Sequence, residues 1–401
     1  MPIEPDWANR FKASLLRTLA TPSVLLTRGE GCYVWDDRGT KYLDFLAGIA
    51  VNSLGHAHPA LVNAVSTQVA TLAHVSNYFA TAPQIELAER LKLITGAGED
   101  GRVYFGNSGA EANEAALKLA RRNNGSGSRT RVVALQNSFH GRTLGALTLT
   151  GKNVLREPFE PLLPGVDHID SSIDALERAI DDRVAALFVE PIKGEAGVVG
   201  LPEGYLTRAR ELTERHGALL IIDEIQTGVG RTGRWFAYEH EGITPDAVTI
   251  AKGIAGGVPL GALVTFGRAS DIFTRGQHGS TFGGNPLATA AANAVLGEIE
   301  ASHLVRNAES RGEEIRRIVH AFSSPLIREV RGRGLLLGLG LTEPVAERLA
   351  HRAFAEGLIV NAPNDSSIRI TPPLIIGDGE IDDFRLKFSR VLSVFDGITR
   401  P

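Results

Sequence analysis

The sequence contains a single cysteine, Cys32, among 401 residues. One cysteine excludes an intramolecular disulfide and is typical of a reducing compartment. Lys and Arg form no dense block and the formal net charge is −4, so the charge pattern predicts no nucleic-acid surface. Long hydrophobic runs are also missing: residues 1–30 carry charges throughout, and no stretch reaches membrane-spanning length. We therefore expect a cytoplasmic protein that binds neither nucleic acid nor membrane.

Hydrophobic residues make up 43% of the chain, and 44 residues are glycine. This hydrophobic content is enough for one large domain and a smaller one. The glycines gather at predicted strand ends, where backbone must come close to ligands. The sequence predicts no internal repeat and no disordered linker.

Apolar periodicity and turn residues predict the order of elements. Alternation predicts a hairpin over residues 31–45 around an Asp-Asp-Arg-Gly turn, and helical spacing predicts an opening helix over 6–18. Further helices are expected over 61–72, 83–93, 285–299, 304–322, 345–356 and 380–398, and strands over 102–105, 132–135, 184–189 and 335–339, the last after a turn at 331–334.

Two apolar runs in the middle of the chain each end on a charged residue. Leu219–Ile222 predicts a strand buried on both faces, and Asp223 and Glu224 follow it. The second run, Ala247–Ala251, ends on Lys252. In open α/β sheets, ligands bind at the carboxyl ends of the strands. A lysine shielded from water can form a Schiff base, and an acid can keep a pyridine nitrogen protonated, so the pair suits pyridoxal phosphate.

Simpler interpretations exist for the same residues. Asp223 and Glu224 can be a solvated strand end, and Lys252 a surface lysine. Gly228–Gly233 also fits the G-x-G-x-x-G pattern of a dinucleotide site. That pattern requires a helix directly after it, whereas Arg234–Phe236 and a mixed polar stretch follow, so a dinucleotide site is disfavoured. A binding protein without catalysis would lack the Lys–Asp pair.

Asn107–Glu114 begins a predicted helix with small residues. The free N–H groups and positive dipole end of such a helix suit a phosphate. An ordinary serine-capped helix with Glu111 as its acidic partner explains the same residues equally well.

His56 and His58 have a spacing that can bind a metal ion. No further Cys, His or acidic ligand is placed beside them. We therefore favour a helix entry with Pro59 in its first turn, and we expect no metal.

Together these motifs resemble the class-III aminotransferases, the ornithine and acetylornithine branch of the fold-type I pyridoxal phosphate enzymes. The resemblance rests on D-E-I-Q-T-G-V-G-R-T-G from Asp223 and D-A-V-T-I-A-K-G up to Gly253, which are long, mixed in residue type and fixed in spacing. It extends over nearly the whole chain through N-S-G-A-E-A-N-E (107–114), F-H-G-R-T (139–143), E-P-I-K-G-E-A-G (190–197), G-S-T-F-G-G-N-P (279–286) and I-R-I-T-P-P-L (368–374). Ala110 replaces a threonine of the family pattern, and Lys193 replaces a glutamine.

The resemblance implies an α/β fold of the fold-type I transferase class. A large domain with a mixed, mostly parallel, seven-stranded sheet is expected over residues 56–300, and a smaller α+β domain built from both termini over 1–55 and 301–401. The resemblance also implies a homodimer with shared active sites, in which Thr281 contacts the phosphate bound by the neighbouring subunit.

The same resemblance assigns roles to individual residues. Lys252 is expected to hold the cofactor covalently and to move protons, and Asp223 to keep its ring nitrogen charged. An aromatic ring stacks on a flat cofactor and a guanidinium grips a carboxylate, which suits Phe139 and Arg142. The expected cofactor site comprises Gly109, Ala110, Phe139, Glu190, Asp223, Glu224, Ile225, Gln226, Lys252 and Thr281. The expected substrate site comprises Arg142, Ser280, Glu195 and Arg369.

The implied reaction moves the terminal amino group of N²-acetyl-L-ornithine to 2-oxoglutarate, a step of arginine biosynthesis. In the ornithine enzymes a tyrosine reaches the free α-amino group, and the matching residue here is Ile49. An isoleucine offers an ammonium no hydrogen bond, which favours an acylated nitrogen over free ornithine. Succinylornithine, ornithine and 4-aminobutyrate stay open as donors, as does a non-transaminating enzyme of the same fold.

Overall fold

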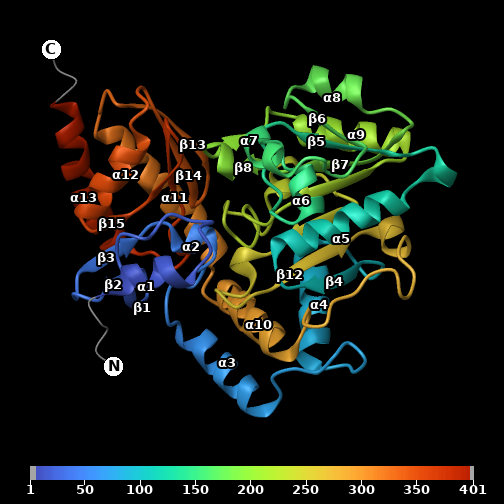
Figure 1. Ribbon diagram of the computed structural model, residues 1–401, viewed down its shortest axis with the longest axis horizontal. Helices are drawn as coiled ribbons and strands as arrows, with labels where there is room; N and C mark the ends of the chain where they lie inside the picture. The colour runs from blue at the N-terminus through green and yellow to red at the C-terminus, as the bar shows by residue number, and fades with distance from the viewer. Residues whose placement is uncertain (1–5, 398–401) are drawn as a thin grey trace.

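A computed structural model describes residues 6–397 and has a seven-stranded sheet at its centre (Figure 1). The strands are ordered β4-β12-β11-β10-β7-β5-β6, and β12 runs antiparallel to its two neighbours while the other pairs are parallel. Their bounds are β4 Arg102–Gly106, β5 Arg131–Leu135, β6 Val166–Ile169, β7 Val184–Val189, β10 Leu219–Asp223, β11 Ala247–Ile250 and β12 Gly261–Thr265. The mixed, mostly parallel sheet implied by the resemblance is confirmed.

Both faces of this sheet are covered, which explains why its central strands are continuous apolar runs. Every residue of β7 and β10 is buried. Within β10, Ile221 packs in one cluster with residues of α5 (Gly109–Arg122), whereas Ile222 packs in another that contains residues of α9 (Tyr205–His216). Successive side chains of a strand point to opposite faces, so one short run fills two layers of core.

The carboxyl ends of β10 and β11 lie at the same edge of the sheet. The two strands are parallel neighbours, and Asp223 pairs with Thr249. Lys252 follows the end of β11 by two residues. The prediction that the acid and the lysine come from adjacent strands is therefore confirmed.

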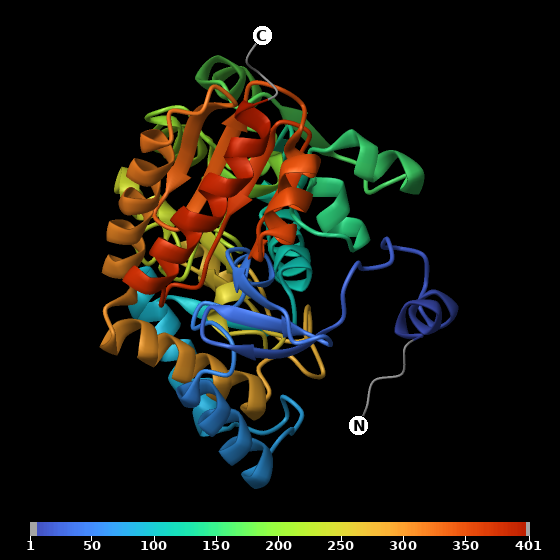
Figure 2. The same cartoon turned by 90° about the vertical axis from the view of Figure 1, so that its left-hand side faces the viewer.

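Segments from both ends of the chain form a second body beside the large sheet (Figure 2). One sheet has the order β1-β2-β3-β15 and the other β13-β14-β17-β16. Their bounds are β1 Leu26–Glu30, β2 Tyr33–Asp36, β3 Lys41–Asp44, β15 Leu358–Ile359, β13 Ile327–Arg333, β14 Leu336–Leu341, β17 Ser367–Ile370 and β16 Asn361–Asn364. The pairing of β3 with β15 agrees with a small domain built from both termini; its bounds at residues 55 and 301 stay a prediction.

Further helices precede, connect or cover the strands of these sheets. They are α1 Trp7–Ser14, α2 Ala47–Ala50, α3 Pro59–Thr71, α4 Ala82–Thr95, α6 Leu144–Leu149, α7 Asn153–Arg156, α8 Ile173–Ala179, α10 Pro286–Ala301, α11 Leu304–Ala321, α12 Ala346–Ala355 and α13 Asp378–Asp396, and a small ribbon joins β8 Ile192–Lys193 to β9 Val199–Gly200. Within residues 6–397, no helix has the length and hydrophobicity needed to cross a membrane.

Three predicted bounds need correction. The opening helix, expected over 6–18, ends at Ser14 and buries none of its residues, and a short helix without a packing partner is marginal. The expected turn at 331–334 is wrong because Arg331–Arg333 belong to β13, which stays paired with β14 up to Leu336. The last helix ends at Asp396, and Ile398 lies outside the described residues.

The histidine pair before α3 has separate structural roles. His56 Nε2 lies 2.8 Å from Asp44 Oδ2, and His58 is the N-cap of α3, where its Nδ1 accepts from the Ala60 N–H. Pro59 is the first residue of the helix, so the predicted helix entry is confirmed. The part of the chain that the structure describes contains no group of three His, Cys, Asp or Glu side chains that could hold a metal ion.

Candidate active site

A cavity of about 380 Å³ lies where β10 and β11 end. The predicted residues that line it are Gly109, Ala110, Phe139, Arg142, Glu190, Glu195, Asp223, Ile225, Gln226 and Lys252. Arg369 stands behind this wall and contacts two of its residues. The cavity wall therefore brings together residues from five separate motifs of the sequence, and Arg369 adds a sixth behind it.

Lys252 begins a 3₁₀ turn directly after β11. Its φ is +47°, a left-handed conformation that a non-glycine residue keeps only when its surroundings hold it there. One such contact is the Ser53 hydroxyl, which donates to the Gly253 carbonyl at 3.2 Å. Burial in the cavity wall lowers the pKa of Lys252 to about 8, although the carboxylate of Glu195 opposes the shift. The amine therefore loses its proton more readily than that of a surface lysine.

Asp223 is surrounded by hydrogen-bond donors. Its Oδ2 accepts from Asn113 Nδ2 and His140 Nδ1, each at 2.8 Å. Its Oδ1 accepts from the Ile225 N–H at 3.0 Å. Burial alone would lower the pKa of His140, but the hydrogen bond and charge of Asp223 outweigh it and raise that pKa. Donors on both oxygens fix the orientation of the carboxylate at the end of β10.

Sequence reasoning missed the roles of Asn113 and His140. Both stand inside motifs that were recognised, one in N-S-G-A-E-A-N-E and the other in F-H-G-R-T. They are separated from Asp223 by 110 and 83 positions, so no local pattern connects them with it. Both side chains are buried and buried polar groups need partners, but this burial is seen only in the structure.

Phe139 and Glu190 form the next part of the wall. Glu190 Oε1 accepts from the Phe139 N–H at 2.7 Å, which ties the loop after β5 to the end of β7. Burial raises the pKa of Glu190 to about 7. The exposed guanidinium of Arg142 lies 5.6 Å from the Phe139 ring centroid. A flat aromatic face and a cation accessible to solvent thus lie side by side at the cavity.

The start of α5 faces the cavity through Ser108, Gly109 and Ala110. The Ser108 hydroxyl accepts from the Glu111 N–H at 3.2 Å, so the helix has the predicted serine cap. A Cβ on Gly109 would lie 2.7 Å from Ile225 Cδ1, so glycine allows the helix start to approach the turn after β10. The first N–H groups of a helix have no partner inside it. The serine cap therefore leaves further N–H groups at this helix start that can bind an anion.

Glu195, Gln226 and Arg369 form a buried polar cluster. Arg369 Nη1 makes an ion pair with Glu195 and donates to Gln226 Oε1 at 3.2 Å. Burial alone would raise the pKa of Glu195, but the charge and hydrogen bond of Arg369 outweigh it and lower that pKa. Gly194 makes room for this cluster, because a Cβ there would lie 1.8 Å from Gln226 Oε1.

Three predicted site residues lie away from the cavity wall. Glu224 is fully buried on the other side of the strand end, where it accepts from the Tyr238 N–H and the Thr227 hydroxyl. Burial raises its pKa to about 7. Ser280 accepts from Asn107 Nδ2 at 3.2 Å, next to the start of α5. Thr281 is exposed on the surface beside it.

Comparison with known proteins identifies relatives over almost the full length of the chain. The sequence profile of the family Aminotransferase class-III matches residues 17–392. The acetylornithine aminotransferase of Mycobacterium tuberculosis (strain ATCC 25618 / H37Rv) is 51% identical over 376 residues, which cover 94% of this chain and 93% of that protein. The acetylornithine aminotransferase of Streptomyces coelicolor is also 51% identical, over 381 residues with the same coverage of both chains.

Solved structures agree in fold. The ornithine aminotransferase from Toxoplasma gondii ME49 has a TM-score of 0.93 and 34% identity, and the match covers 99% of this chain and 97% of that one. The acetylornithine aminotransferase from Elizabethkingia anophelis has a TM-score of 0.86 and 32% identity, with 97% and 98% covered. The chain belongs to the class-III aminotransferases, the pyridoxal phosphate-dependent transferases of fold type I.

Proposed function

We propose that this protein is an acetylornithine aminotransferase, which moves the terminal amino group of N²-acetyl-L-ornithine to 2-oxoglutarate in arginine biosynthesis. The observation that carries the reaction type is the pair of Lys252 and Asp223 on one cavity, delivered by adjacent parallel strands. Identities of 51% to relatives named acetylornithine aminotransferase support this branch of the family.

The residues on the cavity fit pyridoxal phosphate. The Asp223 carboxylate is held in place by three donors, and an acid in this position suits a protonated pyridine nitrogen. The start of α5 offers N–H groups to a phosphate, and Phe139 offers an aromatic face to a ring. Bound there, the cofactor supplies a carbonyl carbon that joins to amino groups and a ring that accepts electrons from the reacting carbon.

The amine of Lys252 suits two roles, covalent attachment of the cofactor and proton transfer. Its pKa of about 8 lets its Nζ lose a proton near neutral pH, which attachment through an amine requires. Once a substrate amine takes its place, the free Nζ takes a proton from the substrate carbon as a general base. Gln226, on the same wall, has an amide that suits the ring hydroxyl of the cofactor.

We assign substrate binding to the cations of the site. Arg142 binds the α-carboxylate of a diamino acid, which leaves the distal amine towards Lys252. Arg369 stays paired with Glu195 while the donor is bound, and it is released to bind a carboxylate of 2-oxoglutarate. The ion pair supports this assignment because Arg369 is buried and an unpaired charge there would be costly.

Ile49 is the basis for an acylated donor. It lies in α2, two residues before Val51, which lines the cavity, and its own side chain is 39% exposed in this single subunit. A hydrocarbon side chain gives an α-ammonium no hydrogen bond. Burying a polar group without a hydrogen-bond partner costs roughly 2–7 kcal/mol, and burying a charged one costs more. An acetylated nitrogen carries no charge and avoids this cost.

A panel of amino donors tests the proposal. The kcat/KM values for acetylornithine, succinylornithine, ornithine and 4-aminobutyrate are measured with 2-oxoglutarate under one set of conditions. Acetylornithine should have the highest value. If free ornithine equals or exceeds it, the donor assignment and the reasoning on Ile49 are both wrong.

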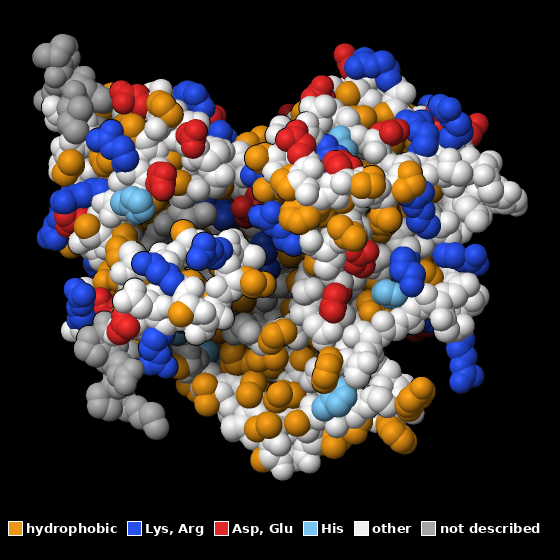
Figure 3. Space-filling model, in the orientation of Figure 1, with side chains coloured by type: hydrophobic (Ala, Val, Ile, Leu, Met, Phe, Trp, Pro, Cys, Tyr) orange, Lys and Arg blue, Asp and Glu red, His pale blue; other side chains and the backbone are white. Residues whose placement is uncertain are grey.

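We also propose a homodimer with shared active sites. Large apolar side chains are exposed around the turn that carries Thr281, namely Leu72, Tyr78, Phe79 and Phe282. Figure 3 shows hydrophobic side chains gathered at the end of the molecule that α3 and α10 form in Figure 1. Asn77 Nδ2 joins the two loops by donating to the carbonyls of Ser280 and Gly283 at 2.9 and 3.0 Å. Contiguous apolar surface of this kind marks an interface.

Subunit mixing tests the shared site. A Lys252→Ala variant and a Ser280→Ala, Thr281→Ala variant are each assayed alone and after mixing under conditions that exchange subunits. One heterodimer site then has both the lysine and the partner's hydroxyls, so mixing should raise activity above the sum of the two parents. An active monomer in sedimentation at assay concentration contradicts the proposal.

A further inference from the structure

Arg231 is a buried cation that makes no ion pair with the residues described by the structure. It lies in the turn after β10, is 2% exposed, and is among the largest of the fully buried side chains by residue volume. Its guanidinium donates to two backbone carbonyls, those of Leu335 at 3.2 Å and of Pro372. Among residues 6–397 it makes no ion pair, and burial lowers its pKa to about 9. Burying an unpaired charge is costly, so a protein that keeps one gains something from its contacts.

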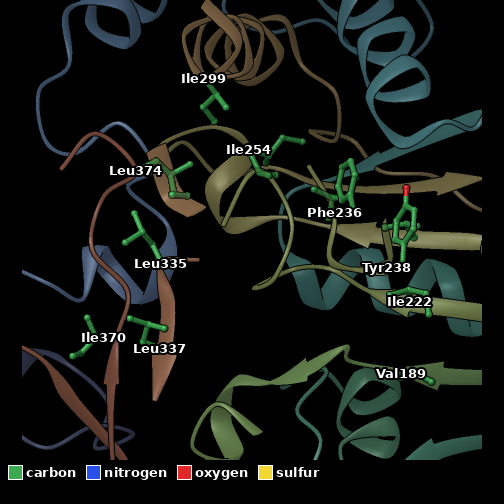
Figure 4. Close-up of a cluster of buried hydrophobic side chains, with 14 of the residues drawn as sticks. Val189, Ile222, Phe236, Tyr238, Ile254, Ile299, Leu335, Leu337, Ile370 and Leu374 are labelled. Carbon is green, nitrogen blue, oxygen red and sulfur yellow. The ribbon is translucent and has the colours of Figure 1, made fainter. Parts of the chain in front are cut away.

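The two carbonyls belong to segments that adjoin the C-terminal sheet, β13-β14-β17-β16, whereas Arg231 belongs to the turn beside the cavity. Leu335 lies between β13 and β14, and its N–H donates back to the Arg231 carbonyl at 2.9 Å. The backbones meet directly at this point, because a Cβ on Gly334 would lie 2.6 Å from the Thr232 carbonyl carbon. Figure 4 shows Leu335 in the same apolar cluster as Ile254, whose 3₁₀ turn begins at Lys252.

Pro372 lies three residues after Arg369 on the same segment. Beyond β17 this segment is fixed by backbone hydrogen bonds: the Thr371 N–H donates to Phe45 O at 2.8 Å, and the Leu374 N–H to Ser53 O at 2.7 Å. Between Thr371 and Leu374 in the sequence, the carbonyl of Pro372 accepts a charge-assisted hydrogen bond from Arg231 in the turn after β10. Both Arg231 and Gln226 belong to that turn, so one rigid piece contacts Pro372 and Arg369 together.

We propose that Arg231 is a positioning residue for the amino acceptor. It holds the segment from Arg369 to Leu374 against the turn from Gln226 to Arg231, and so sets where the Arg369 guanidinium stands relative to the cavity. This inference rests on the proposed binding of a 2-oxoglutarate carboxylate by Arg369. A neutral side chain of similar volume fills the space but leaves the carbonyls of Leu335 and Pro372 without their donor.

The test compares Arg231→Met and Arg231→Lys with Arg316→Lys. Arg316 is a matched control, because its guanidinium also donates to two backbone carbonyls of the C-terminal sheet, those of Val330 and Gly332, away from Arg369. KM and kcat are measured for both substrates. We expect Arg231→Met to raise the KM for 2-oxoglutarate about 10-fold or more, because small misplacements of binding groups are costly, and to leave the donor KM within about threefold. Arg231→Lys should recover part of the loss.

Hydrogen–deuterium exchange of the holoenzyme gives a second readout that does not depend on turnover. The amides of Thr371 and Leu374 should exchange faster in both Arg231 variants and at the normal rate in Arg316→Lys. Should Arg231→Met fail to fold, Arg231→Lys supplies the same comparison. The inference is overturned if both KM values rise together, if Arg316→Lys has the same selective effect, or if exchange at the two amides is unchanged.

An Arg369→Lys variant, measured in parallel, separates this inference from the proposed function. An unchanged KM for 2-oxoglutarate in that variant overturns the acceptor role of Arg369, and the inference with it. A raised KM there together with an unchanged KM in the Arg231 variants overturns the inference alone.

Discussion

Replacing Asp223 by Asn places a donor where the structure has room only for acceptors. The three neighbours of the carboxylate, Asn113 Nδ2, His140 Nδ1 and the Ile225 N–H, all donate to it. An asparagine amide must therefore point its NH₂ group at one or two other donors. His140 can avoid the clash by moving its proton to Nε2, but that atom is buried without a partner. Either arrangement leaves one buried donor unpaired.

Two effects of different size follow from this geometry. An unpaired buried donor costs about 1–3 kcal/mol of stability. The amide also carries no charge, so it no longer holds a proton on the ring nitrogen of the cofactor, and a lost electrostatic contact of this kind costs about 10²–10³ in rate. We therefore expect Asp223→Asn to bind the cofactor, to unfold at lower denaturant concentration, and to lose most of its turnover.

Asp246→Asn is the matched control for this substitution. Asp246 is also buried beside β10 and β11, at their opposite ends, where it accepts from the Leu220 N–H and from Arg210, each at 2.8 Å. Urea unfolding and steady-state turnover are measured for both variants. Asp246→Asn should lose stability but keep turnover. Turnover of Asp223→Asn within about a factor of two of wild type would refute the reasoning, since the expected loss is about 10²–10³.

Three further predictions follow from the site. Borohydride reduction and peptide mapping should leave the pyridoxyl group on Lys252; a label on Lys193, whose pKa burial also lowers, would contradict the assignment. Because Arg369 lowers the pKa of Glu195, their pair stabilises the fold fully above the unfolded Glu pKa of about 4.3 and less as pH falls through the lower folded value. Urea unfolding should therefore show the difference between wild type and Arg369→Gln shrinking below that pH. Ile49→Tyr should raise kcat/KM for free ornithine relative to acetylornithine, and an unchanged ratio would remove the basis for the acylated donor.

Local sequence patterns were enough for the centre of the fold. Buried parallel strands must be apolar on both faces, so β7 and β10 were visible as continuous runs, and the charged residues after β10 and β11 had to lie at the carboxyl edge. The alternation of side chains along a strand also predicts that Asp223 and Glu224 face opposite sides of the sheet. Successive side chains at a strand end point to opposite sides, so only one of the two carboxylates can face the cavity, and the structure turns Glu224 away.

The tertiary structure decided what no local pattern contains. Asp223 accepts hydrogen bonds from Asn113 and His140, which come from two other elements, and the guanidinium of Arg231 donates to carbonyls more than a hundred positions away. The opening helix likewise ends at Ser14, and the leucines that follow it, Leu15 and Leu16, are 55% and 85% exposed. Periodicity reports which face of an element is apolar, because the direction of each side chain depends on local geometry. Which groups meet once they are buried depends on how distant segments pack, and that packing sets hydrogen bonds, pKa values and chemistry.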